Sequence, residues 1–143
     1  AVGKWHLAER LKQYGYSVRC SDIIDRGYPN TEILDFKYAG GGVFNGDIIT
    51  NPPYKYTTEF ILNALSIVPN GNKVAMFLKL QTLEGINRYK QIYSKQPPKT
   101  IYVFTKRIKC FFNGIDDGKS SAIAYAWFVW QKGFKGKPII EFI

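Results

Sequence analysis

The spacing of hydrophobic residues changes along this chain between a helical and an extended pattern, and the changes predict the order of its elements. Residues 60–68 place their apolar side chains on one helix face. Residues 74–78 form an uninterrupted apolar run, which is typical of a strand covered on both faces. Because a short strand is expected at residues 47–50, we predict a parallel crossover unit of strand, helix and strand.

The first part of the chain has the same alternation. Residues 4–14 have helical spacing and are followed by Gly15, a residue that commonly ends helices. Residues 16–21 alternate as a strand does, and Asp22 is expected at its end. A helix and a strand ending in an acidic residue are therefore predicted before the crossover unit.

The last part of the chain predicts mainly strands. After a weaker helical stretch at residues 83–93, strands are expected at residues 100–104 and 122–130. Residues 138–143 are expected to pair with the second of these strands as an antiparallel hairpin. The complete order predicts an α/β fold, in which helices cover both faces of a mostly parallel sheet in a three-layer sandwich.

Composition narrows the class of protein. The chain has 143 residues, of which 45% are hydrophobic, and this is enough for one globular domain spanning residues 1–143. No apolar segment approaches the roughly 20 residues that cross a bilayer, so no membrane partner is expected. Only two cysteines, Cys20 and Cys110, and one histidine are present. We therefore expect a reducing, cytoplasmic location and no metal site.

The charge of the chain indicates a class of partner. Its 20 Lys and Arg residues outnumber 11 Asp and Glu residues, which gives a formal net charge of +9. An excess of this size favours nucleic acid, because basic side chains that neutralise phosphates release counterions. The alternative left open by composition is a basic surface that only keeps the protein soluble.

The stretch with the clearest chemistry is Asn51-Pro52-Pro53-Tyr54. It follows a predicted strand and precedes a predicted helix, and ligands of open α/β sheets bind at the carboxyl ends of strands. Two prolines cannot extend a sheet, so they predict an abrupt and rigid loop. The loop would present an amide oxygen, backbone carbonyls and an aromatic ring to a ligand.

This motif, in this context, resembles the catalytic motif of S-adenosylmethionine-dependent methyltransferases that modify a planar amino nitrogen. It is most similar to the adenine-specific DNA methyltransferases of phage and restriction-modification systems, particularly short members without a separate target recognition domain. Ala1-x-Gly3-x-x-x-Leu7 resembles the end of that family's glycine-rich cofactor loop. The resemblance implies a Rossmann-like catalytic domain, S-adenosylmethionine as cofactor and DNA as partner.

The resemblance also implies how the motif works. The exocyclic nitrogen of adenine is a poor nucleophile, because its lone pair is delocalised into the ring. The side-chain oxygen of Asn51 and the carbonyl of Pro52 would each accept one of its N–H groups and aim the nitrogen at the sulfonium methyl group. Proline has no N–H, so position 52 offers only an acceptor. Tyr54 would stack on the target base after the base leaves the duplex.

Two acidic positions complete the implied cofactor site. Asp22, with Ile23 beside it, would accept hydrogen bonds from the ribose hydroxyls. Asp35 would accept from the adenine amino group of the cofactor, and Phe36 would supply an apolar wall. The implied cofactor-binding residues are Ala1, Gly3, Asp22, Ile23, Asp35, Phe36 and Asn51. The alternative is that Asp22 caps a turn and Asp35 is solvated, because Asp is common in turns.

Residues 106–114 interleave positive charges with aromatic residues. The basic side chains would follow phosphates, and one of two phenylalanines would hold the extruded base against Tyr54. The alternative is that both phenylalanines close the core beneath an exposed basic loop. Together with Tyr54, the candidate nucleic-acid contacts are Lys106, Arg107, Lys109, Phe111 and Phe112.

Two departures from the family pattern leave other functions open. Trp5 stands where the family has a second glycine, and the strand that precedes the glycine loop is missing before Ala1. We therefore expect an N-terminally incomplete catalytic domain whose sheet lacks its first strand. The expected reaction is methyl transfer to the adenine amino nitrogen in DNA, with recognition supplied by loops, a partner subunit or a homodimer. The alternatives are an enzyme acting on protein glutamine or ribosomal RNA guanine, and a catalytically inert nucleic-acid-binding module with this fold.

Overall fold

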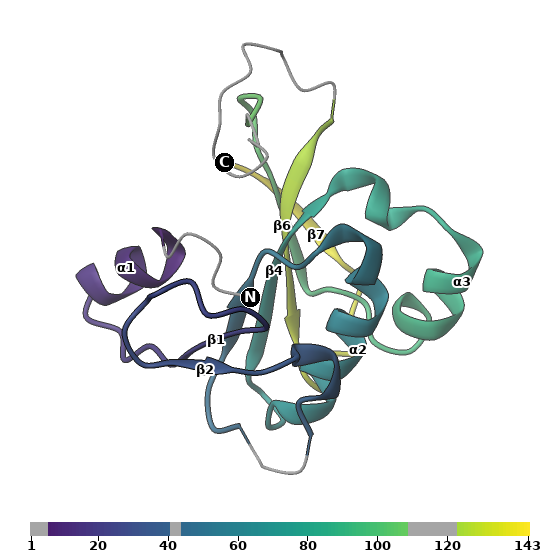
Figure 1. Ribbon diagram of the computed structural model, residues 1–143. Helices are drawn as coiled ribbons and strands as arrows, with labels where there is room; N and C mark the ends of the chain where they lie inside the picture. The colour runs from purple at the N-terminus through teal and green to yellow at the C-terminus, as the bar shows by residue number, and fades with distance from the viewer. Residues whose placement is uncertain (1–5, 41–43, 109–122) are drawn as a thin grey trace.

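The computed structural model describes residues 6–40, 44–108 and 123–143, whose strands form two separate sheets (Figure 1). The smaller sheet is a parallel pair, β1 (Cys20–Asp22) and β2 (Thr31–Ile33). The larger sheet has five strands in the order β3-β4-β6-β5-β7. Its strands are β3 (Ile48–Thr50), β4 (Lys73–Lys79), β5 (Thr100–Val103), β6 (Tyr125–Gln131) and β7 (Ile139–Phe142).

Four strands of the larger sheet run in one direction and β6 runs in the other. β3 is parallel to β4, and β7 is parallel to β5. β6 lies between β4 and β5 and is antiparallel to both. The fold is therefore mixed α/β with a mostly parallel sheet, as predicted from the sequence.

The predicted antiparallel hairpin at the C-terminus is wrong in its pairing. β7 runs opposite to β6, but its hydrogen-bonded neighbour is β5, with Thr100 opposite Ile139. The reason is that both edges of β6 are already paired, one with β4 and the other with β5. β7 lies instead at the outer edge of β5, and there it is parallel to its neighbour.

The helical elements lie where the sequence predicted them, but their bounds and helix types differ from the prediction. Gly15, at φ +83°, follows α1 as expected of a residue that ends a helix. β1 begins four residues after the predicted start of its strand at residue 16. The predicted stretch at residues 83–93 is divided among short helical turns of three types. The elements are α1 (His6–Gln13), the 3-10 turns η1 (Phe36–Tyr38), η2 (Tyr54–Tyr56) and η3 (Leu80–Leu83), α2 (Thr57–Ile67), α3 (Ile86–Arg88) and the π-helical η4 (Tyr89–Tyr93).

The hydrophobic core lies on one face of the larger sheet. Val74, Met76 and Leu78 of β4 are fully buried on this face, which α2 and η4 cover. The opposite face of β4 is only half-buried, as at Phe77. Among the described residues, the predicted covering of both faces by helices is therefore not seen, and Figure 1 shows α1 beside the small sheet instead. The core consists of Phe60, Ile61, Ala64, Leu65, Val68, Val74, Met76, Leu78, Ile92, Ile101, Ala126, Phe128 and Trp130.

Both ends of α2 are fixed by side chains, and this holds the segment that follows β3 in place. At the start of the helix, Thr57 Oγ1 donates to the carbonyl of Tyr54 at 2.9 Å. At its end, Lys132 Nζ donates to the carbonyls of Val68 at 2.7 Å and Ser66 at 3.0 Å. No helix in the described parts of the chain has the length and apolarity needed to cross a membrane.

Candidate functional site

The Asn51-Pro52-Pro53-Tyr54 motif lies where β3 ends. Thr50 and Pro52 are buried, whereas Asn51 between them is exposed. After Pro53 the chain turns directly into η2, whose first hydrogen bond runs from Tyr56 N to Pro53 O at 2.9 Å. Burial on both sides of Asn51 fixes the backbone, so its side chain is presented to solvent from a rigid support.

The ring of Tyr54 is held by a pair of residues from two other strands. Lys79 Nζ lies 4.9 Å from the centre of the ring, and the Tyr125 ring centre lies 6.0 Å from it. Lys79 and Tyr125 are opposite each other in the β4–β6 register, at the same end of the sheet as the carboxyl end of β3. The motif is therefore packed against the end of the central strand pair.

Aromatic side chains continue from Tyr125 across the half-buried face of the sheet. Phe77 stacks on Tyr125 at 5.2 Å and also contacts Trp127 at 5.5 Å and Phe104 at 5.9 Å. Phe104 lies directly after β5 and two residues before Lys106, which is exposed. A continuous set of rings thus connects Tyr54 with the start of the basic segment.

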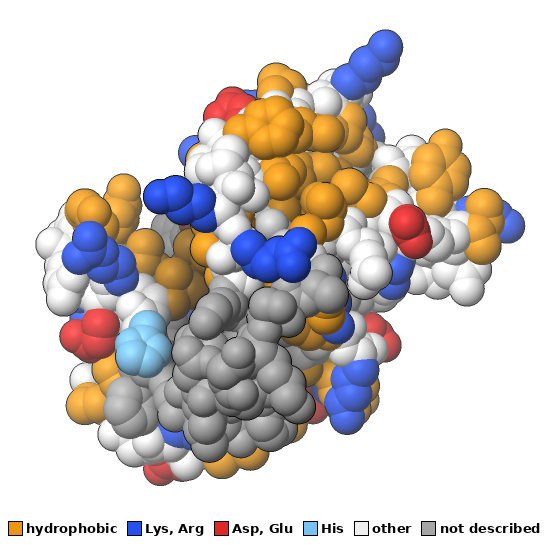
Figure 2. Space-filling model, turned by 90° about the horizontal axis from the view of Figure 1, so that it is seen from above, with side chains coloured by type: hydrophobic (Ala, Val, Ile, Leu, Met, Phe, Trp, Pro, Cys, Tyr) orange, Lys and Arg blue, Asp and Glu red, His pale blue; other side chains and the backbone are white. Residues whose placement is uncertain are grey.

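Figure 2 looks onto this end of the molecule and shows Lys and Arg side chains beside a broad group of hydrophobic ones. Lys106 and Arg107 are exposed beyond β5. The remaining candidates of the basic segment, Lys109, Phe111 and Phe112, lie outside the described residues, as do Ala1 and Gly3 of the glycine loop.

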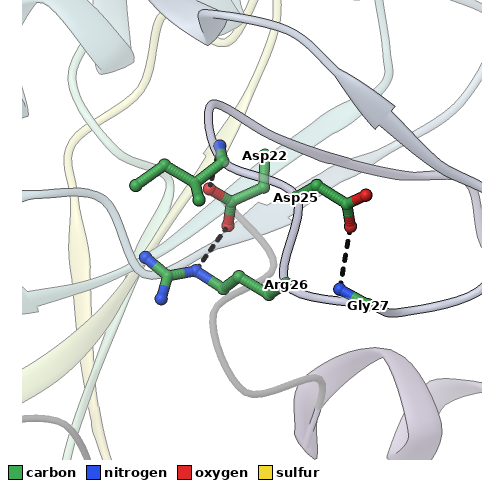
Figure 3. A network of polar contacts seen from close by, with 5 residues as sticks. Asp22, Asp25, Arg26 and Gly27 are labelled. Atoms are coloured by element: carbon green, nitrogen blue, oxygen red, sulfur yellow. Dashed lines mark hydrogen bonds and ion pairs between the residues drawn. The ribbon is translucent and has the colours of Figure 1, made fainter.

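Asp22 lies at the end of β1 and is 5% exposed. Its Oδ1 accepts from Ile24 N at 3.2 Å, and its Oδ2 is 3.8 Å from Nε of Arg26 (Figure 3). The neighbouring Asp25 caps its own turn by accepting from Gly27 N at 2.8 Å. Asp22 therefore does cap a turn, and it also holds a buried negative charge at a strand end.

Asp35 begins η1 and accepts a hydrogen bond from Lys37 N at 3.1 Å. Lys37 Nζ is also 3.4 Å from its Oδ2. Burial disfavours the charged form of Lys37, but the hydrogen bond and charge of Asp35 outweigh it, so the pKa of Lys37 is raised. Asp35 is therefore an ionic and capping partner in this structure.

Asp22 ends β1, and Asp35 follows the adjacent parallel strand β2 by two residues. Leu34 N donates to Asp22 O at 2.8 Å, which extends the β1–β2 pairing to the residue before Asp35. A ribose at Asp22 would compete with Arg26, whose 3.8 Å separation is longer than a direct hydrogen bond. Ile23, 58% exposed, lies beside it. The carboxylates of Asp22 and Asp35 could accept hydrogen bonds from hydroxyl or amino groups of a ligand.

The loop that carries Asp35 is attached to the helix that follows the motif. Asn63 of α2 donates from Nδ2 to the carbonyls of Phe36 and Ala39, the latter at 3.1 Å. The ring of Phe36 lies 5.1 Å from that of Phe60 in the core. The η1 segment follows the small sheet and the motif follows β3 of the larger sheet. The structure therefore joins the two sheets through α2.

Sequence reasoning did not identify four side chains that surround the motif. Lys37 and Lys55 lie over the ring of Tyr56, at 4.3 Å and 4.6 Å, and Lys79 and Tyr125 hold Tyr54. A local signal existed for the first two, because Lys and Tyr alternate at residues 37–38 and 54–56. No local signal existed for the other two, which lie 25 or more residues from the motif.

The described residues contain no group of three or more acidic, His or Cys side chains that would hold a metal ion. Cys20 is buried in β1, and this burial raises the pKa of its thiol. A raised pKa keeps the thiol protonated and unreactive at neutral pH.

Comparisons with known proteins give a distant likeness to a solved structure. No protein-family model matches the sequence, and no curated protein matches it significantly. Among solved structures, the crystal structure of the M1.HpyAVI–SAM complex is similar at 15% sequence identity and a TM-score of 0.37. The match covers 69% of this chain and 58% of the M1.HpyAVI chain. This chain therefore spans less than two thirds of the length of M1.HpyAVI.

Proposed function

We propose that this chain is an S-adenosylmethionine-dependent methyltransferase domain that acts on the exocyclic amino nitrogen of adenine in DNA. The observation that carries the proposal is the presentation of Asn51 between two buried residues, beside a Tyr54 ring held by Lys79. A rigidly held amide oxygen next to an aromatic ring suits the recognition of a planar amino-substituted base. The net charge of +9 favours nucleic acid over protein as the acceptor.

The residues of the motif have separate tasks in this proposal. The side-chain oxygen of Asn51 and the carbonyl of Pro52 accept the two N–H groups of the target nitrogen, which draws its lone pair out of conjugation. Burial of Pro52 fixes its carbonyl, so little reorganisation is needed when the base arrives. Tyr54 stacks on the extruded base and keeps water from its outer face.

Asp22 and Asp35 are the residues proposed to hold the cofactor. Asp22 accepts from the ribose hydroxyls after Arg26 moves aside, and Asp35 accepts from the adenine amino group. Bound S-adenosylmethionine would supply a methyl group activated on a sulfonium. Because η1 is fixed to α2 by Asn63, the cofactor residues and the motif are supported by one helix.

The test is transfer of a labelled methyl group from S-adenosylmethionine to DNA, followed by nucleoside analysis. We expect N6-methyladenine with the wild-type chain and none with Asn51→Ala, while calorimetric affinity for the cofactor is retained by the variant. Asn45→Ala, at an exposed position before β3, is the matched control and should stay active. Cofactor binding without DNA methylation would direct the search to protein glutamine or ribosomal RNA guanine. Absence of cofactor binding would overturn the proposal in favour of an inert binding module.

A further inference from the structure

Four side chains next to the motif form a basic-aromatic cluster that the proposed chemistry does not use. They come from two turns, η1 and η2, which are brought together by the attachment of η1 to α2 through Asn63. The cluster consists of Lys37, Tyr38, Lys55 and Tyr56.

The ring of Tyr56 lies at the centre of the cluster. Lys37 Nζ is 4.3 Å and Lys55 Nζ is 4.6 Å from the centre of this ring. Lys37 Nζ is also 5.2 Å from the ring of Tyr38, whose side chain is 79% exposed. Two ammonium groups and two rings therefore occupy a small area of surface, and one of the rings is open to solvent.

The charges of the cluster are not balanced within the described part of the chain. Asp35 offsets the charge of Lys37 at 3.4 Å, whereas Lys55 forms no ion pair with any described residue. Two like charges on one ring repel each other, and an anion close to both would reduce this repulsion. The cluster is thus complementary to a group such as a phosphate.

We propose that the basic-aromatic cluster binds the strand that carries the target base, with a backbone phosphate at Lys55 and an unpaired neighbouring base on Tyr38. Its position supports this role, because Lys55 and Tyr56 directly follow Tyr54 in η2. A nucleotide next to the one at Asn51 would therefore lie over these side chains. This inference deepens the proposed function and rests on it for the identity of the target strand.

The cluster favours unpaired nucleotides over an intact duplex. In a duplex the base faces are covered by their neighbours, so an exposed tyrosine ring has no face to stack on. In a single strand each base offers an open face, and stacking on an aromatic residue strengthens binding with little regard to sequence. The lysines add a salt-dependent contribution from phosphate neutralisation.

The experiment measures binding of a fluorescent single-stranded DNA oligonucleotide by anisotropy at several salt concentrations. Lys55→Gln should reduce the slope of log affinity against log salt by about 0.7, the value for one phosphate contact on a single strand. Tyr38→Leu should weaken binding about tenfold, as loss of one stacked base does. Both side chains are exposed, so neither change removes a buried contact.

Matched controls come from distant exposed positions of the same residue types. Lys135→Gln lies in the turn between β6 and β7, and Tyr89→Leu changes a 57% exposed tyrosine of η4. Both controls should bind as the wild type does. Unchanged affinity and slope in the two cluster variants would overturn the inference, and so would an equal loss of affinity for a blunt duplex, since stacking requires unpaired bases.

Failure of this inference can be separated from failure of the proposed function, because binding is measured without turnover. One outcome is that the cluster variants bind single-stranded DNA more weakly while the wild type methylates no DNA. This outcome would support the role of the cluster and oppose the proposed reaction. If the wild type methylates DNA and both cluster variants keep their binding and turnover, the proposed reaction is supported and the role of the cluster is overturned.

Discussion

Lys79 Nζ lies 4.9 Å from the centre of the Tyr54 ring, and this contact joins the end of β4 to the Asn51-Pro52-Pro53-Tyr54 motif. The cation faces a ring that is also packed against Tyr125, the residue opposite Lys79 in β6. Because the ring is contacted from two strands, its orientation depends on the register of the central pair. Lys79 is therefore expected to act as a positioning residue for Tyr54.

Replacement of this cation should slow methyl transfer without unfolding the protein. Lys79→Met removes a cation–π contact worth about 0.5–1 kcal/mol, so we expect kcat to fall about two- to fivefold, while Lys79→Arg retains most activity. The measurement is steady-state transfer to DNA, with KM and kcat determined separately. Lys73→Met, at the opposite end of the same strand, is the control and should be neutral. Equal kinetics for Lys79→Met and the wild type would show that Tyr54 does not depend on this contact.

The buried charge of Asp22 should contribute to cofactor affinity. Asp22→Asn keeps an oxygen for the N–H of Ile24 but removes the negative charge, and we expect binding of S-adenosylmethionine to weaken by about 1–3 kcal/mol. Calorimetry measures this change directly. Asp25→Asn, in the turn drawn in Figure 3, is the control because its carboxylate caps only its own loop. The same affinity in both variants would remove Asp22 from the cofactor site.

The exposed cations beyond β5 should contribute to the salt dependence of DNA binding. Neutralising Lys106 and Arg107 together with glutamine should lower the slope of log affinity against log salt by about 1.4 for a single strand. The double variant Lys90→Gln with Lys95→Gln carries the same loss of charge on and after η4 and serves as the control. If both double variants change the slope equally, the effect comes from net charge and not from a contact at this position.

Lys132 should stabilise the fold through the last turn of α2. Its ammonium group donates to the carbonyls of Ser66 and Val68, which have no partner within the helix. Lys132→Met should therefore lower the free energy of unfolding by about 1–2 kcal/mol. Urea denaturation measures the change, and Lys135→Met in the same turn should leave it unaltered. A neutral result for Lys132→Met would mean that water replaces these hydrogen bonds without loss.

Tyr93 should make the fold sensitive to alkaline pH. Burial raises the pKa of Tyr93 from 10.0 to about 12, and its hydroxyl donates to the carbonyl of Thr82 at 2.7 Å. The unfolded chain releases this proton near pH 10 and the folded chain does not, so stability is fully present below pH 10 and is lost as the pH rises toward 12.

Comparison of Tyr93→Phe with the wild type checks this pH dependence. The variant lacks one hydrogen bond, so it should be about 1 kcal/mol less stable at pH 7. Its stability should fall less steeply between pH 10 and 12, because the group that titrates is gone. Tyr89→Phe, at an exposed position, should follow the wild-type curve throughout. Parallel curves for Tyr93→Phe and the wild type would contradict the assignment.

Local patterns predicted most elements of the larger sheet. The apolar run at residues 74–78 became β4 almost residue for residue, because five consecutive apolar side chains have few other stable conformations. Pairing was not predictable in the same way. Nothing in residues 138–143 indicates that both edges of β6 are occupied, and this depends on residues far away along the chain.

In the candidate site, too, the local motif was predictable and the contacts between distant residues were not. Asn51 was identified because its neighbours in sequence form a recognisable motif, and the structure places it exposed at the end of β3 as expected. Lys79 and Tyr125 were missed, because only the β4–β6 register brings two residues so far apart in sequence to the same ring. Lys37 lies beside the motif through its contact with Tyr56, and its local signal was the adjacent pair Lys37-Tyr38.

The central position of β6 determines when this chain can fold during synthesis. β4 and β5 are joined only through β6, which pairs with both and is made of residues 125–131. Every residue up to Gln131 must therefore leave the ribosome before the larger sheet can close. Pairings of this separation form slowly. Until they do, the core residues of α2 and β4 lack their contacts with β6, and apolar surface uncovered in this way favours aggregation.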